Sequence, residues 1–240
     1  MNEKYKYGFI LSLALSTFLN VNAQVTELKQ WLANPKGNLT EQSFAKKALS
    51  KEETMNACDL LGSMWFKTSA QNLRDEWGKM KLKNDTIIMP CAVRVFGPRP
   101  ADGYSLYISM HGGGKAPKEM NDEQWMNQIY MYMPKEGVYV APRAPWNDSD
   151  MWHKKGLDEL LEKLIHCCVT FEGVNPDRVY LLGYSAGGDG VWRMAPRMAD
   201  RWAASSMMAG HPGQSSQVNL RNLPYMIWMG ENDSAYDRNK

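Results

Sequence analysis

Ser185 is the residue of this chain whose sequence surroundings best suit a nucleophile. It lies at the centre of residues 183–187, which read Gly-Tyr-Ser-Ala-Gly, and an apolar run at residues 179–182 precedes it. A serine with a glycine two positions to either side is typical of a tight strand-to-helix turn, where the backbone is strained and passes close to other segments. A second glycine-rich sequence, His-Gly-Gly-Gly at residues 111–114, follows another strand-like run at residues 104–110. Together the two sequences predict a nucleophile beside a loop of bare backbone N–H groups.

The chemistry that this pattern predicts is attack on an acyl carbonyl. A serine hydroxyl is a weak nucleophile until a positioned base removes its proton. The oxyanion that then develops would be held by the backbone N–H of Ala186 and by one from the region of Gly112 and Gly113. Donors of this kind are worth about 3–4 kcal/mol each in related chemistry. We therefore expect an oxyanion hole formed by Gly112, Gly113 and Ala186.

The segments that would position these residues alternate between strand and helix from about residue 84 onward. Strands are expected at residues 86–89, 91–96, 104–110, 137–141, 178–182, 203–208 and 225–229, and helices at residues 121–131, 157–171 and 186–199. Asn121 is expected to cap the first of these helices, with Gln124 at its third position. The alternation predicts a mostly parallel α/β sheet, in which sites form where strands end. The glycine loop, Ser185, His211 and Asp233 all follow predicted strand ends.

From about residue 90 to residue 240, the chain resembles secreted serine α/β-hydrolases of the esterase, lipase and peptidase type. The resemblance rests on residues 111–114, on residues 183–188 and on residues 230–233, which read Gly-Glu-Asn-Asp after a late predicted strand. It implies the α/β-hydrolase fold, a mostly parallel sheet flanked by helices. It also implies that Ser185 lies at the nucleophile elbow and that the reaction uses no cofactor and no metal.

The resemblance places the catalytic acid at Asp233, where it would orient a histidine. Asp237, four residues further on, is a rival for this role. The alternative interpretation of Asp233 is a solvated loop carboxylate. Asp189, in the first turn of the helix after Ser185, is expected to interact with the helix dipole rather than to act in catalysis.

The histidine base is where the sequence departs from the family pattern of serine, acid and then histidine. Seven residues follow Asp233, and none of them is a histidine. His211 is the candidate base within this sequence, because geometry rather than chain order defines a triad. His153, in an aromatic loop, is a poorer candidate. His111 is expected to brace the glycine loop by hydrogen bonding, and His166 lies within a predicted helix.

The position of the histidines also leads us to expect that these 240 residues are the N-terminal part of a longer hydrolase. A helix and a last strand carrying the base would then follow. Without them, the apolar strand at residues 225–229 would lie at an exposed sheet edge, which proteins usually avoid. The α/β-hydrolase domain, expected at residues 84–240, would then be incomplete at its C-terminus.

Residues 1–23 are interpreted as a signal peptide. Lys4 and Lys6 precede an apolar stretch of twelve residues at positions 8–19, and residues 21–23 end in a small-residue cleavage site. Twelve apolar residues are few for a membrane span, although an uncleaved anchor is the alternative. We therefore expect export to the periplasm or the extracellular space, with no membrane span after cleavage. Residues 24–83 are predicted to be a helical segment packed on the main domain, with a capping box at residues 50–53.

Composition limits the classes of partner. The net charge of +2, with 44% hydrophobic and 22% charged residues, is ordinary for a globular protein and gives no indication of a nucleic-acid partner. The four cysteines are Cys58, Cys91, Cys167 and Cys168. The adjacent pair is expected in the core, and no cysteine or histidine spacing is typical of zinc.

Three functions remain open at this point. The first is a secreted serine hydrolase that cleaves carboxylic esters through an acyl-enzyme at Ser185. The second is a serine peptidase of the same fold, because attack on an ester and on an amide uses the same groups. The third is a catalytically inactive binding protein of the α/β-hydrolase fold, favoured by the absence of a final histidine. The partner would be a small-molecule ester or a peptide. The aromatic side chains of the loop at residues 141–152 either line the substrate pocket or anchor the loop by packing.

Overall fold

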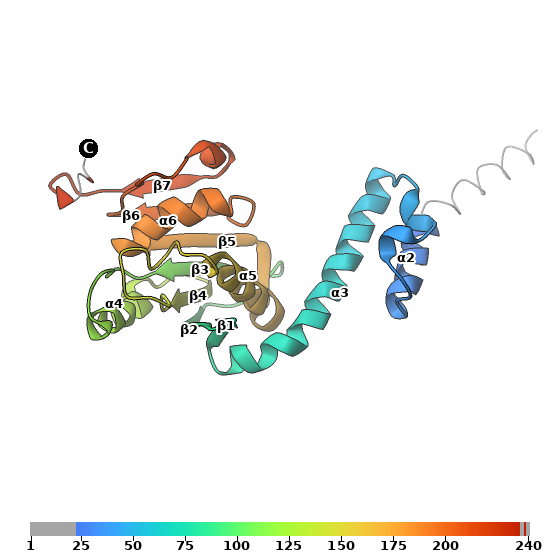
Figure 1. Cartoon of the computed structure of the whole chain (residues 1–240), viewed down its shortest axis with the longest axis horizontal. Coiled ribbons are helices and arrows are strands. Elements are labelled where there is room, and N and C mark those ends of the chain that lie inside the picture. The colour runs from blue at the N-terminus through green and yellow to red at the C-terminus, as the bar shows by residue number, and fades with distance from the viewer. Residues whose placement is uncertain (1–22, 236–237, 239–240) are drawn as a thin grey trace, which may run out of the picture. The chain divides into compact units, whose positions relative to one another are not determined.

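The computed structural model describes residues 23–235 and residue 238, and the chain divides into two compact units between Thr68 and Ser69 (Figure 1). Apart from Ala23, the predicted signal peptide lies outside the described residues, and so does Asp237. Within the described part of the chain, no helix has the length and apolar character that crossing a membrane requires.

The first unit is helical. Its elements are α2 (Ala23–Ala33), the short turns η1 (Leu39–Glu41) and η2 (Phe44–Lys46), and α3 (Lys51–Gly78), which continues into the second unit. The predicted capping box opens α3. The Ser50 N–H donates to Glu53 Oε2 at 2.9 Å, and the Glu53 N–H donates to Ser50 Oγ at 3.2 Å. This reciprocal pair satisfies two N–H groups that the start of a helix leaves without partners.

The second unit is built on one seven-stranded sheet with the order β1-β2-β4-β3-β5-β6-β7 (Figure 1). The strands are β1 (Lys81–Asn84), β2 (Ile87–Phe96), β3 (Tyr104–Met110), β4 (Gly137–Pro142), β5 (Val174–Tyr184), β6 (Ala204–Met208) and β7 (Tyr225–Trp228). β2 pairs antiparallel with β1 and with β4, whereas β4, β3, β5, β6 and β7 run parallel. The predicted mostly parallel α/β sheet is confirmed.

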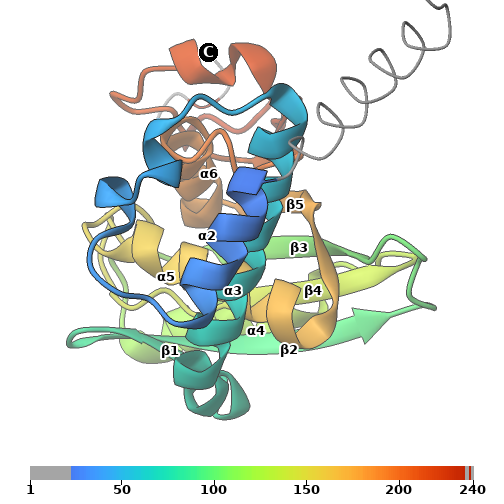
Figure 2. The same ribbon diagram turned by 90° about the vertical axis from the view of Figure 1, so that its right-hand side faces the viewer.

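Helices cover both faces of the sheet, as Figures 1 and 2 show. They are α4 (Lys118–Met131), α5 (Leu157–Cys167) and α6 (Ala186–Arg197), with the short turn η4 (Val218–Asn222) after β6. The alternation of side chains along β4 separates two clusters. Val138 and Val140 belong to the larger core with residues of α5 and α6, while Tyr139 and Ala141 pack with Ile129 of α4. α4 therefore lies on one face, and α5 and α6 lie on the other.

The core position predicted for the adjacent cysteines is confirmed. Cys167 and Cys168 are fully buried free thiols, and burial raises the pKa of Cys167 to about 12. The helix that carries them is shorter than the sequence predicts. α5 ends at Cys167, and residues 168–172 continue as a π-helical turn, η3 (Cys168–Glu172), which ends at Gly173 in the left-handed region.

Two strand predictions are also corrected. Residues 81–84, expected within a helical segment, form β1, because a tight turn at Asp85 lets them pair with the start of β2. The two strands expected at residues 86–89 and 91–96 are one strand. Pro90 does not interrupt it, since its carbonyl oxygen accepts the N–H of Arg143 at 2.7 Å.

Candidate active site

Ser185 occupies a strained turn between β5 and α6. Its backbone angles are φ 56° and ψ −121°, outside the regions that a residue with a side chain ordinarily adopts. Two backbone hydrogen bonds hold it there. The Ser185 N–H donates to the carbonyl of Met208 at 2.9 Å, and the Asp189 N–H donates to the carbonyl of Ser185 at 3.0 Å. Strain of this kind persists only where the surroundings enforce it, and it concentrates at functional sites.

The glycines around Ser185 are required by close approach of the backbone. A Cβ atom added at Gly187 would overlap the carbonyl oxygen of Met110, and one added at Gly183 would overlap the carbonyl oxygen of Gly187. At Gly188 it would lie 2.6 Å from the carbonyl oxygen of Met208. The ends of β3 and β6 thus lie directly against the first turn of α6.

The structure brings the second glycine-rich sequence to Ser185. A Cβ atom added at Gly112 would lie 3.2 Å from the Cβ of Ser185 and 3.3 Å from the carbonyl oxygen of Tyr184. Gly113 has φ 117° and Gly114 has φ 113°, which residues with side chains rarely adopt. The loop and the turn, about 70 residues apart in the chain, therefore form one backbone surface.

Asn121 holds this loop, which is a role that the sequence did not predict. α4 begins at Lys118 with Pro117 at its N-cap, so the prediction that Asn121 caps the helix is wrong. The fully buried Asn121 amide instead accepts the N–H of Gly114 at 3.0 Å and donates to the Gly114 carbonyl at 3.1 Å. It also donates to the carbonyl of Ala116 at 3.1 Å. No local sequence signal marks such a contact, because the residue forms part of an ordinary helical turn.

His111 braces the loop from the other side, as predicted. Its Nδ1 donates to the Gly112 carbonyl at 2.6 Å, and its Nε2 accepts the N–H of Ala144 at 3.1 Å. Since a carbonyl only accepts and an N–H only donates, these contacts fix the neutral ring with its proton on Nδ1. Burial lowers the pKa of His111 to about 4, so the ring stays neutral near pH 7.

The backbone N–H groups of the loop divide into one that is used and two that remain available. Gly114 N–H is bonded to Asn121, whereas those of Gly112 and Gly113 have no acceptor among the described residues. Ala186 is the first residue of α6, where a backbone N–H has no partner within the helix. The arrangement therefore offers donors beside Ser185 that a developing oxyanion could accept.

His211 lies beside the elbow helix but is engaged elsewhere. Its backbone N–H donates to Asp189 Oδ1 at 2.6 Å, and its ring Nδ1 accepts the N–H of Gly213 at 2.9 Å. In the described residues, no hydrogen bond joins its ring to Ser185 or to Asp233. Asp189, expected at the helix dipole, thus anchors the His211 backbone. Burial raises the pKa of Asp189, opposed by the hydrogen bond from His211.

Asp233 follows β7 and forms a long ion pair with Arg238, with 3.6 Å between Oδ2 and Nη1. Its backbone N–H closes a turn by donating to the Gly230 carbonyl at 3.0 Å. Among the described residues, Asp233 has no hydrogen bond with a histidine. The structure therefore brings Ser185 and the glycine loop together. Within the described residues, it joins neither Ser185 nor His211 to Asp233 by a hydrogen bond.

The remaining histidines and the aromatic loop have structural contacts. The Nε2 of His153 lies 3.1 Å from Asp150 Oδ1, and His166 is buried on α5. Trp152 is fully buried, and its indole N–H donates to the carbonyl of His111 at 2.8 Å. For Trp152, the interpretation as a loop anchor is the one that the structure bears out.

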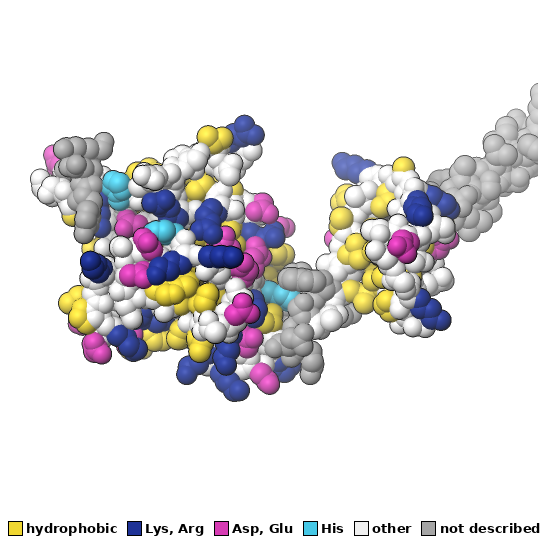
Figure 3. Space-filling model, viewed as in Figure 1, with side chains coloured by type: hydrophobic (Ala, Val, Ile, Leu, Met, Phe, Trp, Pro, Cys, Tyr) yellow, Lys and Arg dark blue, Asp and Glu magenta, His cyan; other side chains and the backbone are white. Residues whose placement is uncertain are grey.

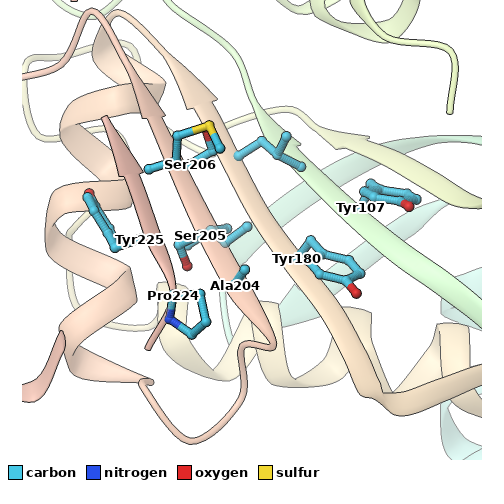
Figure 4. Close-up of a pocket in the computed structure, with 10 residues that line it drawn as sticks. Tyr107, Tyr180, Ala204, Ser205, Ser206, Pro224 and Tyr225 are labelled. Carbon is cyan, nitrogen blue, oxygen red and sulfur yellow. The ribbon is translucent and has the colours of Figure 1, made fainter. Parts of the chain in front are cut away.

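One hollow lies on a face of the sheet, beside the middle of β3, the second half of β5 and the first residues of β6 and β7. It has a volume of about 290 Å³ and lies between Tyr107, Tyr180, Ser206 and Tyr225 (Figure 4). Parallel sheets place binding sites at the carboxyl ends of their strands.

The described residues contain no cluster of three or more histidine, cysteine or acidic side chains able to hold a metal.

Comparison with known proteins places this geometry in a fold. The chain is similar to a thermostable esterase with a TM-score of 0.50 and 18% sequence identity, over 65% of this chain and 46% of that one. It is also similar to an alpha-beta serine hydrolase homologue from Coxiella burnetii, with a TM-score of 0.41 and 10% identity over 63% and 72% of the two chains. Est1E from Butyrivibrio proteoclasticus has a TM-score of 0.37 and 17% identity over 55% of this chain and 51% of that one.

The chain thus spans about half the length of the esterases it matches. At such low identities the likeness concerns the fold, and the predicted α/β-hydrolase fold is confirmed. No family model matches the chain, and no curated protein matches it.

Proposed function

We propose that this protein is a serine hydrolase that cleaves carboxylic esters through an acyl-enzyme intermediate at Ser185. The observation that carries the proposal is the strained Ser185 turn, with Gly112 packed against it and unused N–H groups beside it. A folded chain maintains strain of about 1–3 kcal/mol at one residue only where the surroundings enforce it. The fold, shared with an esterase, adds support.

In the proposed reaction, Ser185 Oγ forms a bond to the acyl carbon while a base takes its proton. The carbonyl oxygen becomes an oxyanion that accepts hydrogen bonds from Ala186 and from Gly112 or Gly113. The tetrahedral intermediate then expels the alcohol, which receives the proton from the base. Water repeats the sequence on the acyl-enzyme and releases the carboxylic acid.

The proposed base within this chain is His211, oriented by Asp233. Supporting this choice, His211 follows β6 and its backbone is tied to the first turn of α6 through Asp189. To act, its ring must leave the N–H of Gly213, since an Nδ1 that accepts leaves the proton on Nε2. Asp233 must likewise give up its ion pair with Arg238 and accept a hydrogen bond from the His211 ring.

The test is the reaction of the full chain with a fluorophosphonate, followed by intact mass, together with hydrolysis of short p-nitrophenyl esters. We expect one covalent adduct per chain. Ser185→Ala should abolish it, whereas Ser63→Ala, which removes an exposed hydroxyl on α3, should not. His211→Ala should slow labelling by at least about 100-fold, the usual scale of general base catalysis.

Folded protein that forms no adduct would overturn hydrolase activity of these 240 residues with His211 as the base. An adduct that persists in Ser185→Ala would overturn the nucleophile. Faster cleavage of peptide amides than of esters would replace the esterase by a peptidase. Full labelling of His211→Ala would remove His211 as the base.

A further inference from the structure

A second hollow lies along the flank of α6, with a volume of about 310 Å³. It is lined by His153, Arg193, Pro196, Arg197, Ser215, Ser216 and Asn219. These residues come from the loop before α5, from α6, and from the segment that joins β6 to η4. The volume is at the lower end of the range typical of small-molecule sites, and three separate segments converge on it.

Arg193 gives the hollow a positive charge that no side chain in the described part of the chain neutralises. The side chain is half-buried and forms no ion pair or hydrogen bond with any described residue. Arg197, one turn later, bonds both carboxylate oxygens of Asp158 and the carbonyl of His153. Asp189, one turn earlier, is committed to the N–H of His211.

Of the residues that the structure describes, no acidic side chain lines the hollow. On the face of the molecule seen in Figure 3, by contrast, Lys and Arg side chains are interspersed with Asp and Glu side chains. A guanidinium that is partly withdrawn from water and left without a counter-charge attracts an anion more strongly than a fully hydrated one does. The planar fork of arginine suits two oxygens of a carboxylate or phosphate.

Two buried polar atoms beside Arg193 also lack partners among the described residues. They are Ser215 Oγ and His153 Nδ1, both on residues that line the hollow. Buried polar groups are nearly always hydrogen-bonded, so each such atom requires an explanation. A bound oxyanion would accept a hydrogen bond from the Ser215 hydroxyl while it pairs with Arg193.

We propose that this hollow binds a small molecule through a carboxylate or phosphate group held by Arg193 and Ser215. The hollow is separate from the proposed nucleophile. Arg193 follows Ser185 by eight positions, which is about 12 Å along the helix axis. The inference therefore does not depend on hydrolase activity.

The test is an NMR titration of the full chain with inorganic phosphate and, in a separate arm, with acetate, followed through the amides of Gly213 and Ser215. We expect saturable shifts with at least one anion, and the arm that saturates at lower concentration identifies the preferred group. Arg193→Gln should raise the Kd at least about tenfold, and Ser215→Ala about threefold. Arg221→Gln removes an exposed charge on η4 and should leave the Kd unchanged.

An absence of saturable shifts with either anion would overturn the proposal. An unchanged Kd in Arg193→Gln, with the folded spectrum retained, would also overturn it. If Arg221→Gln raised the Kd as much as Arg193→Gln does, the anion would be responding to the overall positive charge of the protein, and a specific site at Arg193 would be overturned. If phosphate slowed fluorophosphonate labelling in proportion to its binding, the hollow would not be a separate site.

Discussion

The nucleophile region of the candidate site, around Ser185, and the turn that carries Asp233 are held in place by different kinds of contact. Around Ser185, backbone packs directly on backbone, and Gly183, Gly187 and Gly188 leave no room for a Cβ atom. At Asp233, within the described residues, the contacts are a single turn hydrogen bond to the Gly230 carbonyl and an ion pair with Arg238 that spans 3.6 Å.

The difference shows which part of a catalytic site a short motif can specify. Glycines that permit one backbone path also exclude most others, so the turn and the loop at Gly112 are set by local sequence together with close packing. A histidine and an acid meet only if two loops direct their side chains toward each other. In this chain, His211 and Asp233 each have another partner.

The largest expected effect comes from breaking the backbone contact. Gly187→Ala places a Cβ atom on the carbonyl oxygen of Met110, so β3 and α6 must separate. We expect the free energy of unfolding to fall by about 3 kcal/mol, as for severe overpacking. Urea denaturation followed by circular dichroism measures it.

Gly230→Ala is the matched change in the other region. The added Cβ atom would lie 3.7 Å from the Cβ of Asp233, an ordinary contact. Its effect should remain within about 1 kcal/mol, because the backbone there accepts a side chain. Equal losses in the two variants would show that both regions are packed alike and would contradict the comparison.

The next effect concerns the neutral His111 that braces the glycine loop. Its pKa is lowered to about 4 in the folded protein, against about 6.5 in an unfolded chain. Between these values the unfolded state binds more protons, so the free energy of unfolding falls as the pH falls from about 6.5 to about 4. The loss is on the order of 3 kcal/mol.

His111→Gln removes the titrating ring, and its unfolding free energy should therefore change less over the same pH range. The variant is expected to be less stable than the parent at pH 7, since the contacts to Gly112 and Ala144 are altered. Denaturation midpoints between pH 4 and pH 7 give both slopes. If the unfolding free energy of the variant depended on pH as steeply as that of the parent, His111 would not be the source of the pH dependence.

The sequence predicts much of this fold because its signals are local. The alternation of apolar strands and helices predicts the parallel sheet, and the glycines at residues 183–188 predict the turn at Ser185. β1 was missed because residues 81–84 become a strand only by pairing with β2. Asn121 was misassigned for a related reason, since the loop it holds is brought to it by the tertiary fold.

The unpaired charge of Arg193 could not be inferred from sequence either. With Asp189 and Arg197 at spacings of four, the helix surface predicts ordinary ion pairs along one face. The structure instead commits Asp189 to the backbone of His211, and it pairs Arg197 with Asp158. Only the three-dimensional arrangement leaves Arg193 without a counter-charge among residues 23–235 and residue 238.

The smallest expected effect tests whether the turn at Ser185 is strained. Ser185→Gly replaces a residue at φ 56° and ψ −121° with one that adopts such angles freely. Relief of about 1–3 kcal/mol of strain is partly offset by the greater entropy of glycine in the unfolded chain, so we expect a net gain of about 1 kcal/mol. Ser63→Gly, within α3, should instead lose about 0.5 kcal/mol, because glycine is less favourable than serine inside a helix. If both variants lost stability in chemical denaturation, the Ser185 backbone would be relaxed, and the contrast between the two regions would rest on packing alone.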